Sequence, residues 1–180
     1  MSTVNGRICD RVTAGPTITV ESRGKETMDI RVVDDGNKKQ QITRLVLEAL
    51  PDWFGVSETR ENYINESAGL PLIGAFDEGK PVGFLCLKET GQDTMEVHVM
   101  GVLMDHHRTG IGKAMFQKAK EVAVDGGYSF MQVKTVQMGL YDDYDRTNLF
   151  YRALGFKEFE VIPTLWDELN PCQIYVMSLR

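Results

Sequence analysis

The sequence predicts one domain of the α/β (α+β) class, in which strands and helices alternate along the chain. Residues 94–127 carry the strongest signal: a strand, a turn with two glycines, and a helix with apolar side chains three to four residues apart. Residues 71–76 and 81–87 are two apolar strands joined by a short polar segment that suits a hairpin turn. A chain of 180 residues with 42% hydrophobic and 26% charged residues is large enough for one domain with its own core.

The first part of the chain predicts an extension ahead of the main domain. Residues 1–27 contain several glycines, have no helical period, and offer one short strand over 17–21. We interpret them as an N-terminal extension that could pair on a sheet edge, mediate a dimer or be loosely ordered, as termini often are. The main domain is then expected over residues 28–180, beginning with a strand over 30–33.

Two helices are expected before the hairpin. The first follows the turn at 34–37 and ends before Pro51, because the residue ahead of a proline disfavours helical geometry. Ser57 offers an N-cap for the second helix, which runs towards Gly69. Trp53 and Phe54 lie between the two helices, and packing in the core is the favoured interpretation of these aromatic side chains over contact with a substrate.

The elements after the hairpin follow from the same patterns. In the strand at 94–103, strict alternation would place Glu96, His98, Met100 and Val102 on one face. The next helix is expected to begin near Gly110 and to end at the paired glycines 126–127, which accept the left-handed conformation. Beyond it we expect a strand over 130–136, a polar loop over 139–145, a helix over 146–154, a strand over 156–162, a loop over 163–171 and a last strand over 173–177.

The turn before the long helix predicts an anion site. Gly110 and Gly112 have no side chains, so the backbone can approach a ligand closely. The first N–H groups of a helix have no internal partners, and the helix dipole adds partial positive charge. These features suit a phosphate or pyrophosphate. Two common phosphate-binding patterns do not fit, because each requires a glycine where this chain has His107 or Met115.

Two stretches resemble motifs of the GNAT superfamily of N-acetyltransferases. Residues 107–112, His-Arg-Thr-Gly-Ile-Gly, resemble motif A, usually Q/R-x-x-G-x-G/A, although the first position holds His107 rather than Gln or Arg. Residues 147–156, Thr-Asn-Leu-Phe-Tyr-Arg-Ala-Leu-Gly-Phe, resemble motif B, which often ends in a tyrosine followed closely by Gly-Phe. The two motifs occur in the usual order and at the usual separation, and the resemblance covers roughly residues 28–180.

This resemblance implies a fold and a cosubstrate. The GNAT fold is a mixed, mostly antiparallel sheet flanked by helices and splayed where acetyl-CoA enters. The backbone of the strand end binds the pantetheine arm in this family, and the turn binds the pyrophosphate. One residue of the motif B helix, one turn before the tyrosine, would lie on the side of the pantetheine. The cofactor-binding residues implied are Gly101, Val102, Leu103, His107, Arg108, Thr109, Gly110, Ile111, Gly112, Lys113 and Asn148.

Three residues are candidates for the chemistry of acetyl transfer to an amine, which requires loss of a proton from the ammonium group and protonation of the departing thiolate. A glutamate matching Glu96 is the base in the histone-acetyltransferase branch, and burial could raise the pKa of this carboxyl into the working range. His98 is the rival base or a relay through water, because imidazole titrates near neutral pH. Tyr151 matches the motif B tyrosine, which can donate a proton to the thiolate; Tyr141 and Tyr144 are alternatives.

Charge and cysteine content narrow the partners. A net charge of -6 argues against general nucleic-acid binding and is compatible with a cationic amine, which the acidic residues of the 139–145 loop could attract. The histidines and the three scattered cysteines lack metal-ligand spacing, and no disulfide framework is indicated. We also expect no membrane span, no signal peptide and a reducing cytoplasm; a homodimer would be in keeping with the family.

Two functions of different classes remain open from the sequence. The first is an acetyl-CoA-dependent N-acetyltransferase acting by direct attack on a small amine, an antibiotic amine or a protein amino group. The second is a GNAT-fold module that binds CoA or an acyl-CoA without turnover, as a sensor or scaffold. Glu96, His98 and Tyr151 favour the enzyme. Neither the acceptor nor the choice of another acyl donor can be derived, although five aromatic residues would give an aromatic-rich pocket if they converge: Trp53, Phe54, Tyr141, Tyr144 and Trp166.

Overall fold

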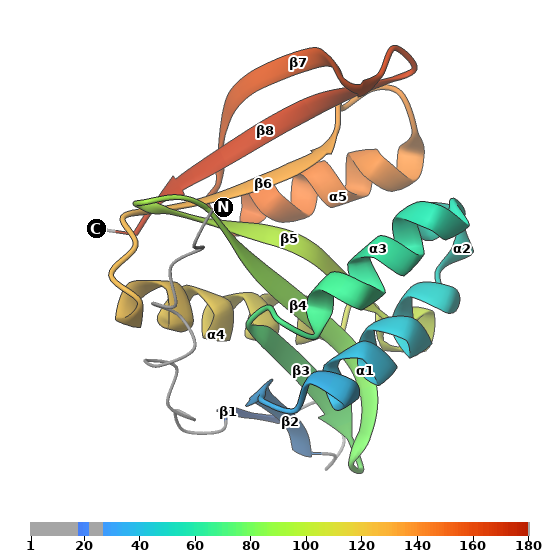
Figure 1. Ribbon diagram of the computed structural model, residues 1–180, viewed down its shortest axis with the longest axis vertical. Coiled ribbons are helices and arrows are strands. Elements are labelled where there is room, and N and C mark those ends of the chain that lie inside the picture. Colours follow the sequence, from blue (N-terminus) through green and yellow to red (C-terminus); the bar gives the residue numbers. More distant parts are fainter. Residues whose placement is uncertain (1–17, 22–26, 180) are drawn as a thin grey trace, which may run out of the picture.

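The computed structural model describes residues 18–21 and 27–179, and its strands form a single eight-stranded sheet. The strands lie in the order β1-β2-β3-β4-β5-β6-β8-β7. Their bounds are β1 Ile18–Glu21, β2 Thr27–Val33, β3 Leu72–Asp77, β4 Lys80–Gly91, β5 Thr94–Val102, β6 Phe130–Val136, β7 Lys157–Asp167 and β8 Asn170–Ser178. Every neighbouring pair is antiparallel except β5 and β6, which are parallel. The predicted mixed, mostly antiparallel sheet is confirmed (Figure 1).

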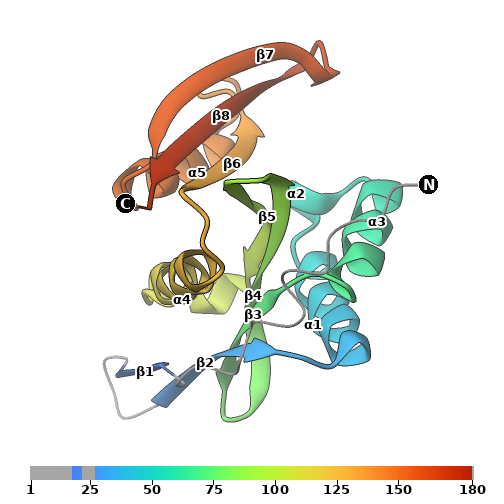
Figure 2. The ribbon, with the colours of Figure 1, turned by 60° about the vertical axis from the view of Figure 1, so that its left-hand side comes forward.

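Helices cover both faces of the sheet. Helices α1 (Gly36–Glu48), α2 (Pro51–Phe54) and α3 (Ser57–Ser67) lie on one face, and α4 (Ile111–Asp125) lies on the other (Figure 2). Helix α5 (Asp142–Ala153) follows β6, and a short 3-10 turn, η1 (Met104–His106), joins β5 to the α4 region. The hairpin of β7 and β8 forms the far end of the molecule (Figures 1 and 2).

Two apolar clusters hold these layers together. The larger cluster lies between the sheet and α4 and includes Met115, Ala119 and Tyr151. The smaller one lies between the sheet and the α1–α3 layer and includes Val46, Leu47 and Ile64. Each cluster buries one stripe of its helices, as the three-to-four-residue spacing of apolar side chains predicts. The sheet is therefore buried on both faces around its centre.

A β-bulge at His98 changes which face the later residues of β5 use. Cys86 of β4 pairs with Val99, whereas the next residue, Leu87, pairs with Val97, so His98 is an extra residue without a direct partner. Val97 and Met100 consequently both pack with the α4 cluster. Strict alternation, which placed Met100 and Val102 on the face of Glu96 and His98, is therefore wrong beyond the bulge.

Three predicted boundaries in the polar segments also differ from the structure. Helix α5 begins at Asp142 rather than after a loop over 139–145, because its first-turn carboxylates interact well with the positive end of the helix dipole. The expected loop over 163–171 is mostly strand, with an irregular ladder between Ile162 and Asp167, and only the turn at 168–169 separates β7 from β8. Ser57 is the first residue of α3, and Val56 takes the N-cap position without a side-chain hydrogen bond.

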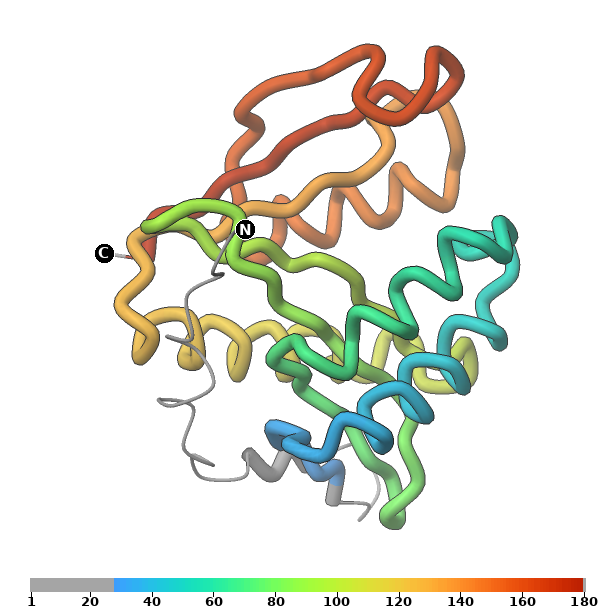
Figure 3. Tube along the Cα trace, viewed as in Figure 1, coloured from blue at the N-terminus to red at the C-terminus, as the bar shows by residue number. Residues whose placement is uncertain are grey.

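The N-terminal extension lies mostly outside the described residues. Within it the structure places β1, Ile18–Glu21, antiparallel to β2 at the edge of the sheet. The short strand predicted over 17–21 is thus found for the four residues described. The chain path from β2 onward can be followed in Figure 3.

Candidate active site

The sheet opens between β5 and β6. These two strands pair only over Thr94–Val97 and Phe130–Val133, after which β6 continues beside β8 alone. Figures 1 and 3 show the two strands diverging from this point. The splay predicted for the fold is confirmed, and it leaves one edge of β5 from His98 to Val102 without a strand partner in the part of the chain that the structure describes.

The main chain of β5 presents hydrogen-bonding groups to this opening. The N–H of Leu103 donates to the carbonyl of Val82 on β4. Because main-chain groups alternate in direction along a strand, Gly101 and Leu103 point their groups to β4, and Met100 and Val102 point theirs to the opening. Sequence reasoning chose Gly101, Val102 and Leu103 and missed Met100, since the direction is fixed only by the pairing with β4.

His107 holds the end of this strand edge. Its Nε2 lies 2.7 Å from the carbonyl oxygen of Val102, so the ring nitrogen donates and the carbonyl accepts. The ring also lies edge-on to Trp53, with centroids 6.3 Å apart. His107 is therefore more than a turn residue, because it ties the motif A turn to the open edge of β5.

The turn from Arg108 to Lys113 carries six consecutive N–H groups without an acceptor among the described residues. The first main-chain bond of the helix is made by Ala114, whose N–H donates to the carbonyl of Gly110. Unpaired donors in a row at a helix N-terminus form a concave anion site. Arg108 and Lys113 are exposed and add positive charge, whereas Ile111 is buried and contributes only its main chain. This arrangement fits the pyrophosphate of a CoA thioester.

The two glycines of the turn serve different purposes. Gly110 has a φ of 91° and open space where a side chain would be. Glycine is therefore favoured at this N-cap by the left-handed backbone conformation rather than by lack of space. A Cβ on Gly112 would lie 3.2 Å from the ring of Phe150. Gly112 is thus required by the packing of α5 on α4, in addition to any approach of a ligand. The hydroxyl of Thr109 donates to the carbonyl of His106 at 2.7 Å and braces the same turn.

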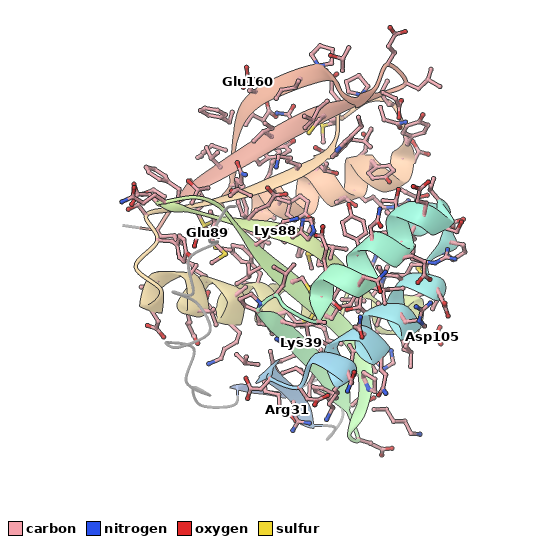
Figure 4. The ribbon with its side chains drawn as sticks, in the orientation of Figure 1. Arg31, Lys39, Lys88, Glu89, Asp105 and Glu160 are labelled. Atoms are coloured by element: carbon pink, nitrogen blue, oxygen red, sulfur yellow. The ribbon has the colours of Figure 1, made fainter. Side chains whose placement is uncertain are left out.

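His98 is the centre of a charged cluster at the opening. Its Nε2 lies 2.7 Å from Oε2 of Glu66 on α3, and its Nδ1 lies 3.9 Å from Oε1 of Glu96. Glu66 also accepts from Lys88 of β4, labelled in Figure 4, at 2.8 Å. On the other side, Oε2 of Glu96 accepts from Lys134 of β6 at 2.5 Å and from Gln132 at 2.9 Å. Four elements therefore contribute to the cluster, and no local sequence signal points to Glu66, Lys88 or Lys134.

The carboxyl of Glu96 does not have the raised pKa that burial alone suggested. Burial raises its pKa, but His98, Lys134 and Gln132 stabilise the charged form, and the pKa ends below its ordinary value. Glu96 is therefore an anion held by a lysine. This weakens Glu96 as a base relative to His98, although both residues lie where the sequence predicted.

Tyr151 lies in the α4 cluster, close to the opening. Burial raises the pKa of its hydroxyl well above the ordinary range, and the Tyr63 hydroxyl from the opposite face of the sheet adds to the shift. Within the described ranges the Tyr151 hydroxyl makes no hydrogen bond, so this O–H is available to a ligand.

Asn148 does not fit its predicted role at the pantetheine arm. It is fully buried, and its Nδ2 donates to the carbonyls of Val136 at 3.0 Å and Tyr144 at 2.7 Å. Its Oδ1 accepts from the hydroxyl of Tyr175 at 2.8 Å. Because these bonds use its polar atoms, Asn148 joins α5 to β6 and β8 and has a structural role.

Four of the five predicted aromatic residues lie around the opening in two groups. Tyr144 contacts Tyr141, and its hydroxyl lies 3.5 Å from the carbonyl oxygen of Trp53. Phe54 contacts Tyr63, whose ring lies edge-on to His98 with centroids 5.2 Å apart. Trp166 is exposed on the β7–β8 hairpin and makes no ring contact among the described residues, so it does not join them.

Two of the carboxylates predicted to attract an amine already bind neighbouring groups of the chain. Asp143 pairs with Arg146, and Asp145 accepts from the N–H of Gly139 at 2.7 Å.

Within the described ranges, no group of three or more His, Cys, Asp or Glu residues is arranged to hold a metal ion. No helix found in those ranges has the length and apolar character that a membrane span requires.

Comparison with known proteins identifies the family. Residues 39–156 match the model of the acetyltransferase (GNAT) family. The match spans more than half of the chain and includes β5, the motif A turn and all of α5. The chain therefore belongs to the GNAT acetyltransferase family.

Solved structures of low sequence identity share the fold. A protein assigned to the GNAT family from Desulfovibrio desulfuricans is 15% identical, with a TM-score of 0.73 over 85% of this chain and 99% of that one. YncA from Salmonella typhimurium, solved with its cofactor acetyl-CoA, is 15% identical, with a TM-score of 0.64 over 85% and 94%. An aminoglycoside 6'-N-acetyltransferase solved with coenzyme A is 18% identical, with a TM-score of 0.60 over 83% and 97%. The family match shows an acetyltransferase of the GNAT family, and these neighbours share its fold, two of them with acetyl-CoA or coenzyme A bound.

Proposed function

We propose that the protein is an N-acetyltransferase that moves the acetyl group of acetyl-CoA to a primary amine by direct attack in a ternary complex. The observation that carries this proposal is the position of His98. One of its ring nitrogens is bound by Glu66, and the other is beyond hydrogen-bond distance of Glu96. His98 also lies at the bulge from which the open edge of β5 begins, beside the expected site of the thioester.

Each step of acetyl transfer is assigned to particular residues. When bound, acetyl-CoA supplies the activated acetyl thioester. The N–H groups of residues 108–113 hold its pyrophosphate, and the main chain of Met100 and Val102 holds the pantetheine arm. His98, next to Glu96, accepts a proton from the ammonium group of the acceptor, and Tyr151 gives a proton to the departing thiolate. Overall, one C–N bond forms, one C–S bond breaks, the thiolate gains a proton and one proton goes to water.

The high pKa of Tyr151 supports its role as an acid rather than a base. A buried hydroxyl whose charged form is strongly disfavoured stays protonated at neutral pH and can donate. A hydroxyl with a raised pKa is a weaker acid than a free tyrosine, so its transfer to the thiolate requires that burial in the same space also raises the pKa of the thiol. Tyr151 therefore acts late in the reaction, when the C–S bond breaks.

The acceptor that fits best is a cationic primary amine on a small molecule or a protein. Glu66 and Glu96 bring two carboxylates to His98, and the chain has a net charge of -6. Acetyltransferases for nourseothricin and for aminoglycosides, which carry amino groups, are among the structural neighbours. An amino group of such an antibiotic is accordingly one of the acceptors to test first.

Three further features belong to this proposal. Cys86 and Cys172 are free, buried thiols, which suits a reducing cytoplasm. The division between an extension over 1–27 and a domain over 28–180 stays a prediction. Assembly as a homodimer also stays a prediction.

The test is release of free thiol from acetyl-CoA against a panel of amines. The panel holds aminoglycosides, streptothricin-type antibiotics, polyamines, amino acids and lysine peptides, with Glu96→Gln and Tyr151→Phe beside the wild type. We expect turnover with at least one amine and lower kcat in Tyr151→Phe, with acetyl-CoA binding retained. Binding of acetyl-CoA by calorimetry without transfer to any amine would contradict the enzyme and favour a binding module.

A further inference from the structure

We propose that Glu66 of α3 is a positioning residue for this reaction, which fixes His98 as the base by holding its Nε2 and leaving its Nδ1 free to accept a proton. The inference deepens the proposed function and rests on it. Neither motif A nor motif B includes Glu66, and it lies 32 residues before His98 in the chain.

The contact between Glu66 and His98 determines which ring nitrogen carries the proton. Oε2 of Glu66 lies 2.7 Å from Nε2 of His98. An ionised carboxylate can only accept, so Nε2 must carry the hydrogen and donate it. In the neutral ring the other nitrogen, Nδ1, then has a free lone pair. Glu66 thereby prepares His98 to act as a base through Nδ1.

Glu66 is itself held in place. Lys88 donates to the same Oε2 atom at 2.8 Å, and this contact keeps the pKa of the Glu66 carboxyl below its ordinary value, with a smaller contribution from His98. The ring of Tyr63, one turn earlier on α3, lies edge-on to His98. The side chain of His98 is only 15% exposed. The imidazole is therefore fixed by contacts from α3 on two sides.

The opposite side of the ring explains why Nδ1 rather than Glu96 receives the proton. Oε2 of Glu96 is already bound by Lys134 and Gln132, and its other oxygen, Oε1, lies 3.9 Å from Nδ1. This distance is too long for a hydrogen bond, but an ammonium group placed between the two atoms could donate to both. After transfer, the imidazolium would lie between the carboxylates of Glu66 and Glu96.

The charged and titratable groups around His98 come from four elements: Tyr63 and Glu66 from α3, Lys88 from β4, Glu96 from β5, and Lys134 from β6. Each lysine is bound to a carboxylate rather than directed at the ring. The cluster can therefore support a positive charge on His98 during the reaction. Removing Glu66 removes both the orientation of the ring and one of the two carboxylates beside it.

The experiment compares Glu66→Ala and Glu66→Gln with the wild type. The matched control is Glu61→Gln, which removes another carboxylate of α3 whose two oxygens bind Arg44 at 2.6 and 2.7 Å and which does not contact His98. Kinetics with the acceptor found in the panel give kcat and KM, and calorimetry gives the affinity for acetyl-CoA. Nitrogen chemical shifts of the histidine rings report the tautomer of His98 and require no acceptor.

We expect wild-type His98 to carry its proton on Nε2 and Glu66→Ala to show a mixture of tautomers. In Glu66→Ala, kcat should fall about 10- to 100-fold, the scale on which partners that orient histidines act, with acetyl-CoA affinity unchanged. Glu66→Gln should recover part of the rate, since its amide oxygen still accepts from Nε2. Glu61→Gln should keep wild-type kcat.

Other results would overturn the inference without touching the proposed function. These are a proton on Nδ1 in the wild type, or a kcat that is unchanged in Glu66→Ala while His98→Ala is inactive. An equal loss in Glu61→Gln would show that the effect is one of helix stability. Failure of the wild type to acetylate any amine would defeat the proposed function instead, and the tautomer measurement would then decide the geometry alone.

Discussion

Two parts of the same site, both anchored on β5, are built in different ways. The motif A turn is one continuous segment, residues 108–113, and it offers main-chain N–H groups. The cluster around His98 is assembled by side chains from α3, β4, β5 and β6. The first depends on backbone conformation and tolerates changes of side chain, whereas the second depends on the identity of each side chain. The cosubstrate site and the base should therefore fail separately.

The largest effect is expected from His98→Ala. Removing a general base typically costs about 10²- to 10⁴-fold in rate, and we expect kcat to fall within that range. Acetyl-CoA affinity should stay within about twofold, because the motif A turn is untouched. Steady-state kinetics and calorimetry check the two numbers. A similar loss of acetyl-CoA binding would show that the two parts are not separable.

The next effect is expected from Gly110→Val, which places a branched side chain at a φ of 91°. Such strain costs about 1–3 kcal/mol, so we expect acetyl-CoA affinity to fall about 5- to 150-fold as the turn relaxes. Gly79→Val is the matched control, since Gly79 has a φ of 79° and equally open space but lies in the β3–β4 hairpin. Gly79→Val should lower the stability of the fold without lowering the affinity for acetyl-CoA. Equal weakening by both variants would contradict the assigned role of the turn.

Lys134→Met tests how the cluster holds Glu96. Burial would then act on the carboxylate without the lysine, so we expect its pKa to rise and the free energy of unfolding at neutral pH to fall by about 1–3 kcal/mol.

The sign of the pH dependence follows from these pKa shifts. In the wild type the lowered pKa adds stability at neutral pH that is lost as pH falls through it. In the variant the raised pKa means that protonation on acidification relieves the buried charge. The difference between the two proteins should therefore shrink at low pH. Urea unfolding over a pH series measures the unfolding free energy of both proteins. A difference that stays constant with pH would contradict the assigned role of Lys134.

The smallest effect is expected from Arg108→Ala. Arg108 is exposed, and the main chain supplies the donors of the turn. We expect acetyl-CoA affinity to change by less than about fivefold, in keeping with an exposed charge worth at most about 1 kcal/mol. Calorimetry at two salt concentrations measures the acetyl-CoA affinity of the wild type and of Arg108→Ala. A loss as large as that in Gly110→Val would mean that side-chain charge, rather than the backbone, dominates the site.

The same contrast explains how much the sequence could predict. The turn at 108–113 and the strand before it could be predicted because both are local: glycines, a helix start and a run of alternating side chains lie within twenty residues. The strand at 130–136 was placed correctly for the same reason. Tyr151 could be placed because it lies within a motif of ten residues.

The parts that could not be predicted depend on pairing between distant segments. The bulge at His98 is fixed by β4, and it reverses the faces of the residues that follow. Glu66 lies at an exposed position of α3, where nothing in the local sequence distinguishes it from other charged residues. Lys134 alternates along β6 like any strand residue, and only the parallel pairing of β5 with β6 brings it to Glu96.

The sequence predicts both strands of the β7–β8 hairpin, but their extension into the expected loop over 163–171 could not be predicted, for a related reason. Pro163 and Pro171 suggest a loop, yet both lie where the ladder is irregular: Pro163 between Ile162 and Asp167 of β7, and Pro171 between Asn170 and Cys172 of β8. β7 is also the last strand of the sheet, and an edge strand tolerates proline because one side needs no partner. A pattern of residues cannot reveal which strand will be at an edge.

The most direct test of the site is a titration of the isotope-labelled protein with acetyl-CoA, followed by the backbone amide signals in NMR. The account predicts the largest shifts at the six amides of Arg108 to Lys113, with further shifts at Met100 and Val102 on the open edge of β5. Unchanged signals at these amides, together with large shifts elsewhere, would contradict it.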